Sequence, residues 1–290
     1  MRKLPRDDRK RYQALAEAVG DRPVSRHALH RLLLAGQPTR EVDLDRRKGP
    51  FEPGRRLIDH LDRLRDAPLA PGIDRTAILA EAIAEIDDTV RIAQRGKNSC
   101  VATTATILLA RQKPAEFVRI VAGLASPAGV VRMAGGKDLR RSEGWNTQDD
   151  GGRTTTSRLL QSALLNFGAA LPTTYDPISD SHRFGPISTG NGLTGGGSAR
   201  INSQLQGRPF EAHLFTTIDR SFEWHRVTTA LAAGKGPFPV GLQWGSGGSH
   251  EVLLEGIRDS WVIFTNPSGH RQHLSVDEFR SHLRSAEIPR

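Results

Sequence analysis

The chain has 290 residues and a formal net charge of +9, with 37% hydrophobic and 25% charged residues. This length and composition describe a globular chain with one large domain or two smaller ones, and we expect no membrane span because no apolar run reaches about 18 residues. Basic residues are spread along the chain and only 6% of residues are aromatic, which argues against nucleic-acid binding.

The first half of the sequence is helical in pattern. Apolar residues recur at helical spacing over residues 7–36, 57–64, 76–93 and 114–133, and Asp74 is placed to cap the third of these segments. Residues 38–54 are polar and rich in turn formers, as a connector is. From Cys100 to about residue 110 the sequence is small or apolar on nearly every face, which predicts a central buried helix.

The second half changes character. Residues 134–156 and 172–208 read as loops, the latter with Gly195-Gly196-Gly197, and a helix is expected over 157–167. A short strand at 211–215 and a helix over 222–233 precede three expected strands at 238–244, 250–256 and 260–265. Ser275 and Glu278 form a capping-box pattern that opens a final helix. Helices followed by an antiparallel sheet indicate an α+β fold, with the cysteine-bearing helix packed on the sheet.

Cys100 is the only cysteine, so it forms no internal disulfide and no cysteine metal cluster. It is either a buried structural thiol or a nucleophile. At the start of a helix the backbone N–H groups favour an anion, but the helix dipole contributes only about 0.3–1 kcal/mol, less than one pKa unit. Reactive cysteines have pKa values of roughly 3.5–7.5, so an imidazolium partner is required to lower the pKa this far.

His250 and Asn266 are the candidate partners. His250 begins one expected strand and Asn266 ends the next, with the turn near Arg258 and Asp259. The two outer ends of such a hairpin lie side by side, so we expect the Asn266 amide to orient the His250 ring. Gln94, in the loop before Cys100, is expected to join the Cys100 N–H as an oxyanion donor.

The order of these residues resembles a known family. Gln94 six residues before Cys100, then His250 and Asn266, is similar to the papain-like cysteine peptidases, and most similar to the bacterial C39-like branch. The likeness covers roughly residues 90–285 and includes the final Asp277-Glu278-Phe279. Val101 stands where the family more often has Gly, Asn266 replaces the Asp usual in that branch, and residues 134–208 match no part of the pattern.

The resemblance implies a papain-like hydrolase domain over residues 76–290, with residues 1–75 as a helical region for targeting, partner binding or inhibition. It implies a cysteine peptidase that cleaves protein or peptide amide bonds without a metal or organic cofactor. His270 and His273 form an H-x-x-H pattern too sparse to predict a metal site.

Other readings of the same pattern remain open. One is acyl transfer or deamidation on a protein glutamine by a bacterial toxin or effector, and another is a catalytically inactive binding module. The charged start, Met1-Arg2-Lys3, has no apolar segment, so we expect a bacterial cytoplasmic location or export without a classical signal peptide.

Overall fold

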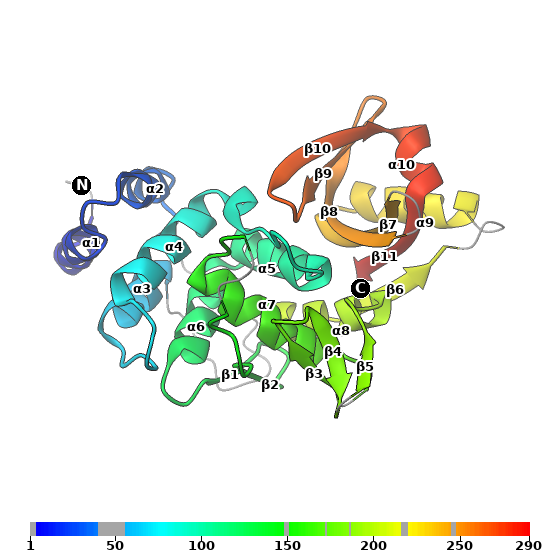
Figure 1. The fold of residues 1–290 in the computed structure, drawn as a ribbon. Coiled ribbons are helices and arrows are strands. Elements are labelled where there is room, and N and C mark those ends of the chain that lie inside the picture. Colours follow the sequence, from blue (N-terminus) through cyan, green and yellow to red (C-terminus); the bar gives the residue numbers. More distant parts are fainter. Residues whose placement is uncertain are drawn as a thin grey trace.

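A computed structural model describes residues 4–39, 56–147, 151–171, 173–185, 187–215, 220–244 and 248–290. Within these ranges the chain forms ten α-helices, one short 3-10 helix and eleven strands, and every strand pairing is antiparallel. Helices α1 to α7 gather at one end of the molecule, and the large sheet lies at the other with α9 and α10 beside it (Figure 1). The predicted α+β class is therefore confirmed.

The helical end is built by the first half of the chain. Its elements are α1 (Arg6–Ala18), α2 (Pro23–Leu34), α3 (Leu57–Asp66), α4 (Arg75–Asp87), η1 (Thr89–Arg91), α5 (Cys100–Gln112) and α6 (Pro114–Ala125). Asp74 caps α4 as predicted, accepting the N–H of Ala77 at 3.0 Å. Every residue from Val101 to Ala110 is buried, so α5 is the predicted central helix.

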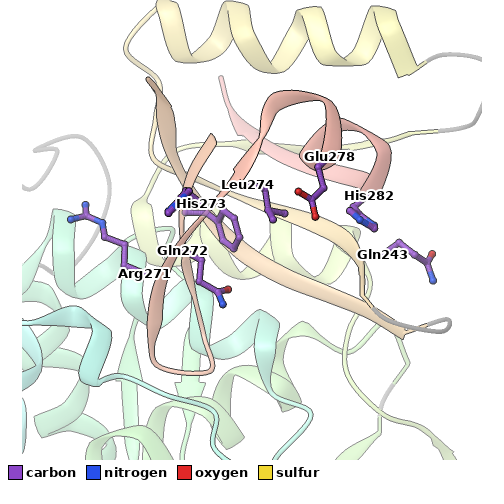
Figure 2. Close-up of a pocket in the computed structure, with 8 residues that line it drawn as sticks. Gln243, Arg271, Gln272, His273, Leu274, Glu278 and His282 are labelled. Atoms are coloured by element: carbon purple, nitrogen blue, oxygen red, sulfur yellow. The ribbon is translucent and has the colours of Figure 1, made fainter. Parts of the chain in front are cut away.

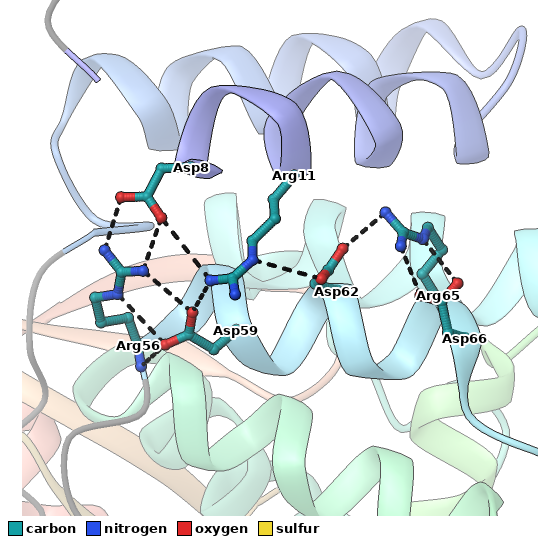
Figure 3. A network of polar contacts seen from close by, with 7 residues as sticks. All are labelled: Asp8, Arg11, Arg56, Asp59, Asp62, Arg65 and Asp66. Carbon is teal, nitrogen blue, oxygen red and sulfur yellow. Dashed lines mark hydrogen bonds and ion pairs between the residues drawn. The ribbon is translucent and has the colours of Figure 1, made fainter. Parts of the chain in front are cut away.

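An ion-pair network joins α1 to α3 (Figure 3). Both terminal nitrogens of Arg56 donate to the Asp8 carboxylate at 2.7 Å, and Asp8 is only 3% exposed. Arg11 donates to Asp59 at 2.6 Å. Bidentate arginine–carboxylate pairs are among the stronger polar contacts, and here they fix α1 over the start of α3.

The proposed boundary near residue 75 divides elements that share one core. α3 packs on α6 and α2 packs on α4, and the apolar side chains of α3 lie in the same cluster as those of α5 and α6. Residues 40–55 of the expected connector lie outside the described residues. The division into residues 1–75 and 76–290 stays a prediction.

The middle of the chain has more structure than expected. Its elements are β1 (Val130–Arg132), β2 (Asp138–Arg140), α7 (Thr155–Gly168), β3 (Thr174–Asp176), β4 (Ser181–Phe184), β5 (Ile187–Gly190) and α8 (Gly195–Gln206). The helix expected over 114–133 ends at Ala125, because a residue before proline favours an extended backbone and Ser126 precedes Pro127.

The glycines at 195–197 begin α8 rather than lying in a loop. A Cβ on Gly195 would lie 2.6 Å from the Glu287 Oε1, and one on Gly197 would lie 2.7 Å from the Gly168 carbonyl oxygen. Glycine is needed at these two positions because the start of α8 packs closely against its neighbours. The helix was missed because glycine lowers helix propensity, whereas here packing decides.

The large sheet has the strand order β10-β9-β8-β7-β11-β6. Its elements and connecting helices are β6 (Phe210–Leu214), α9 (Arg220–Ala232), β7 (Phe238–Trp244), β8 (Gly248–Arg258), β9 (Trp261–Asn266), β10 (His270–Ser275), α10 (Val276–His282) and β11 (Leu283–Pro289). The three expected strands and the Ser275 cap are confirmed, but β10 and β11 were missed and the final helix is short.

Helices cover both faces of this sheet. α5 packs against β8 on one face and α8 packs against β11 and β6, while α10 contacts β7, β9 and β10. Phe264 of β9 packs against Phe279 of α10, with ring centroids 5.6 Å apart. Among the described residues no helix is long and apolar enough to cross a membrane.

Candidate active site

His250 and Asn266 meet at the end of the β8–β9 hairpin. Leu253 lies opposite Thr265 in this pair, so the same register brings Val252 opposite Asn266 and puts His250 one step diagonally away on the same face. The His250 Nε2 lies 2.9 Å from the Asn266 Oδ1. The hydrogen bond expected from the hairpin is present.

The surroundings of Asn266 fix the tautomer of His250. The backbone N–H of Ser268 donates to the Asn266 Oδ1 at 2.9 Å, and the Asn266 Nδ2 donates to the Gln272 Oε1 at 2.8 Å. An N–H only donates, so the atom that faces His250 is the amide oxygen. The His250 Nε2 therefore carries a proton and its Nδ1 carries a lone pair.

His250 is neutral at pH 7. Burial lowers its pKa below the usual 6.5, and the hydrogen bond to Asn266 offsets only part of this effect. A neutral imidazole with a lone pair on Nδ1 is a proton acceptor. The neutral His250 ring can therefore accept a proton as a general base, and it is not an imidazolium cation at rest.

Cys100 begins α5 beside the same strand. The backbone N–H of Glu251, the residue after His250, is directed at the thiol, as are the N–H groups of Val101 and Cys100 itself. The Thr104 hydroxyl donates to the Glu251 carbonyl oxygen at 3.2 Å and so fixes the first turn of α5 to β8. These contacts place the thiol against the backbone of β8 at Glu251, the residue that follows His250.

The pKa of the Cys100 thiol differs from the sequence expectation. Burial raises it to about 11, the Glu251 carboxylate adds to the increase, and the three backbone N–H groups lower it only in part. The sequence predicted a lowered pKa with an imidazolium beside the thiol. Because the sheet covers the start of the helix, burial outweighs the backbone N–H groups, and a thiol with this pKa keeps its proton at pH 7.

Gln94 is tied to the sheet. Its backbone N–H donates to the Pro267 carbonyl oxygen at 2.8 Å, directly after Asn266. Its side-chain Oε1 is buried and has no hydrogen-bond partner among the described residues. The loop that ends in Cys100 and the strand that ends in Asn266 are therefore joined at the candidate oxyanion site.

The sequence interpretation missed two buried carboxyl groups in the sheet, of which Glu251 acts on the Cys100 thiol and Glu287 acts on Glu251. Glu251 is 4% exposed and Glu287 is fully buried, and each has one carboxyl oxygen without a hydrogen-bond partner among the described residues. Burial raises the pKa of Glu251 to about 8, and burial together with Glu251 raises that of Glu287. A charged residue within an apolar strand was the available signal for Glu251.

A pocket of about 510 Å³ lies among β7, β9, β10 and α10 (Figure 2). Gln272, which accepts from Asn266, lines this pocket together with the apolar Phe264 and Leu274. Its remaining walls are polar and come from β7, β10 and α10: Gln243, Arg271, His273, Glu278 and His282. The volume is in the range of small-molecule and side-chain sites.

His270 and His273 do not gather further ligands. Among the described residues no group of three or more His, Cys, Asp or Glu side chains is placed to hold a metal ion. The His273 ring packs edge-on against Trp261, with centroids 4.9 Å apart, so this histidine has a packing role.

The site combines a buried thiol, a neutral imidazole oriented by an amide, and a side-chain amide donor. No protein-family model matches the chain, and no curated protein matches it.

Proposed function

We propose that the protein is a thiol hydrolase of papain-like fold, most similar to the C39-like peptidases, that cleaves amide bonds of a protein or peptide substrate. One observation carries the proposal. The hydrogen bond from the His250 Nε2 to the Asn266 Oδ1 leaves a lone pair on Nδ1, and the backbone N–H of Glu251, the next residue in the same strand, is directed at the Cys100 thiol. A base oriented by a third group next to a nucleophile is the arrangement that nucleophilic catalysis requires.

The proposed reaction begins from a neutral pair. The Cys100 sulfur attacks the substrate carbonyl carbon while its proton passes to the His250 Nδ1, and the carbonyl π electrons move onto oxygen. The Cys100 N–H and the Gln94 Nε2 donate to that oxyanion. The imidazolium then protonates the leaving amine as the C–N bond breaks. Water, deprotonated by His250, releases the acyl group and regenerates the thiol, so the cycle uses no metal or organic cofactor.

The test is peptide cleavage followed by mass spectrometry. The wild-type protein, incubated with a proteome-derived peptide mixture, is expected to produce new termini, and Cys100→Ser or His250→Ala to lower their rate of formation at least about a thousandfold. His27→Ala, at an exposed histidine on α2, is the control and keeps the wild-type rate. A mass increase of one dalton or a crosslink in place of cleavage identifies deamidation or acyl transfer. Full activity of Cys100→Ser would overturn the mechanism.

The raised pKa of Cys100 favours a second candidate, a binding module in which the thiol does no chemistry. A thiol with a pKa near 11 has about 300-fold less thiolate at pH 7 than an ordinary thiol with a pKa of about 8.5. The two candidates differ in the presence of substrate: the hydrolase accumulates an acyl group on Cys100 that mass spectrometry detects, and the binding module does not. For both the hydrolase and the binding module, we propose a bacterial protein that is cytoplasmic or exported.

A further inference from the structure

One buried side chain holds both ends of the loop between Gln94 and Cys100. Gln161, on α7, is fully buried. Its Nε2 donates to the Ala93 carbonyl oxygen at 3.3 Å, and its Oε1 accepts the Ser99 hydroxyl at 2.9 Å. The two contacts flank the segment that carries Gln94 and leads to the candidate nucleophile.

A carboxylate from a different segment holds the middle of the same loop. The backbone N–H and the side-chain Nδ2 of Asn98 both donate to the Asp180 Oδ2, at 2.8 and 2.7 Å. The Tyr175 hydroxyl donates to the other oxygen, Oδ1, at 2.6 Å and so orients the carboxylate. Asp180 itself has a φ of +51°, a left-handed backbone that aspartate tolerates better than most residues.

A third contact comes from the same turn. The Lys97 Nζ donates to the Pro177 carbonyl oxygen at 2.7 Å, and Lys97 is 6% exposed. Within the loop, Arg95 has a φ of +54° and the Lys97 N–H donates to the Gln94 carbonyl oxygen at 3.2 Å. A loop with one internal hydrogen bond and a left-handed arginine depends on outside contacts for its shape.

These contacts have a direct consequence for the candidate oxyanion site. Its two donors, the Gln94 Nε2 and the Cys100 N–H, lie at opposite ends of the loop. An oxyanion site needs both donors within about 2.7–3.1 Å of one point, and a displacement of about 1 Å costs on the order of a hundredfold in rate. The distance between the two donors is set by what holds the loop.

We propose that Asp180, in the turn between β3 and β4, is a positioning residue that sets the Gln94–Cys100 geometry together with Gln161. The inference rests on the proposed function and adds a task for the segment between residues 134 and 208, which the family resemblance leaves without one. Asp180 touches neither substrate nor thiol, and it acts through Asn98.

The test compares Asp180→Asn with Asp176→Asn. The Asp176 carboxylate lies in the same hairpin but accepts from the Ser179 hydroxyl and the Ile178 N–H, away from the loop. Asp180→Asn replaces one carboxylate oxygen by an NH2 group, which cannot accept from Asn98. If the NH2 group turns toward Tyr175 instead, only a neutral amide oxygen is left to accept from Asn98, and it is a weaker acceptor than the carboxylate. We expect kcat for peptide cleavage to fall about tenfold to a hundredfold with KM within about twofold, and Asp176→Asn to match the wild type.

A second readout requires no substrate. Hydrogen exchange of the Asn98 amide, followed by mass spectrometry of a peptide spanning the loop, is expected to speed up at least about tenfold in Asp180→Asn and to be unchanged in Asp176→Asn. If the wild-type protein cleaves nothing, the proposed function fails, while the exchange comparison still decides whether Asp180 holds the loop.

The positioning role is overturned if Asp180→Asn has the kcat and the Asn98 exchange rate of Asp176→Asn. Equal losses in both variants would likewise overturn it, because they would show general damage to the hairpin. Should Asp180→Asn not fold, Tyr175→Phe removes only the hydroxyl that orients Asp180. A smaller fall in kcat with faster Asn98 exchange is then expected, and wild-type values for both would overturn the role.

Discussion

The helical and the sheet ends of the molecule hold their parts of the candidate site in different ways. His250 and Asn266 belong to one hairpin, so the register of two adjacent strands brings them together. Gln94 and Cys100 lie on a loop whose position depends on α7 and on the β3–β4 turn, about 60 to 80 residues further along the chain. The candidate base is thus positioned locally, whereas the candidate nucleophile and its candidate oxyanion donor are positioned by long-range contacts.

The largest expected effect is on the stability of the helical end. Leu61 on α3 is fully buried in the core shared with α6, and truncation to alanine leaves a cavity. We expect Leu61→Ala to lower the free energy of unfolding by about 2–5 kcal/mol in urea denaturation. Leu34→Ala, at a side chain that is 75% exposed, is the matched control and is expected to change it by less than about 0.5 kcal/mol.

A small loss of unfolding free energy in Leu61→Ala would show that α3 is separable from the core that it shares with α6. It would support residues 1–75 as an independent or removable segment, which the shared core argues against.

The second largest expected effect is on kcat and concerns the loop between Gln94 and Cys100. Gln94→Ala and Gln94→Glu both remove the amide donor, and the second keeps the size of the side chain. We expect each to lower kcat for peptide cleavage by about 10²–10³-fold, with the free energy of unfolding nearly unchanged. Wild-type kcat in Gln94→Glu would remove Gln94 from the oxyanion site and leave the Cys100 N–H as its donor.

The contrast between local and long-range positioning also explains which features could be predicted from the sequence. Strand alternation and the spacing from His250 to Asn266 carry the hairpin register, so this part of the site was predicted correctly. Asp74 and Ser275 were recognised as caps for the same reason, because a cap acts within one turn of its helix.

The long-range parts of the structure could not be predicted in this way. Spacing along the chain does not indicate that Gln161 and Asp180 contact the loop before Cys100. The glycines of α8 predict a loop, because the close packing against Glu287 that requires glycine cannot be recognised in the sequence. The raised pKa of Cys100 was missed because it depends on burial by the sheet. A buried glutamine within the apolar run of α7 was the available signal for Gln161.

The pH dependence of stability tests the buried acids at both ends. The pKa of Glu85 on α4 is raised to about 7 and that of Glu251 on β8 to about 8, both by burial. The folded state holds these protons longer than the unfolded state, so the stabilisation present at low pH is lost as the pH rises through these values. Between pH 6.5 and 8.5 we expect these two carboxyls to lower the free energy of unfolding by roughly 2–3 kcal/mol, and Glu287, whose pKa is also raised by burial, to add to the fall.

This window avoids the buried histidines, whose lowered pKa values act below pH 6.5. Glu251→Gln is expected to lower this slope more than Glu85→Gln does, since the slope from each carboxyl continues up to its folded-state pKa and that of Glu251 is the higher. A flat profile in the wild-type protein would show that the two carboxyls are already ionised at pH 6.5.

The smallest expected effect comes from a change in the hydrogen-bond partner of His250. Asn266→Asp puts a carboxylate where the amide oxygen accepts from Nε2, and an opposite charge at this distance raises a histidine pKa by about 1–3 units. We expect NMR titration of the His250 ring to show this rise, with the exposed His27 as internal reference. The imidazolium would then persist at neutral pH and favour the Cys100 thiolate, so alkylation of Cys100 by iodoacetamide at pH 7 should become faster. An unchanged alkylation rate despite the raised pKa of His250 would separate the ring from the thiol, and the pairing of the helical and sheet ends in one catalytic site would then be wrong.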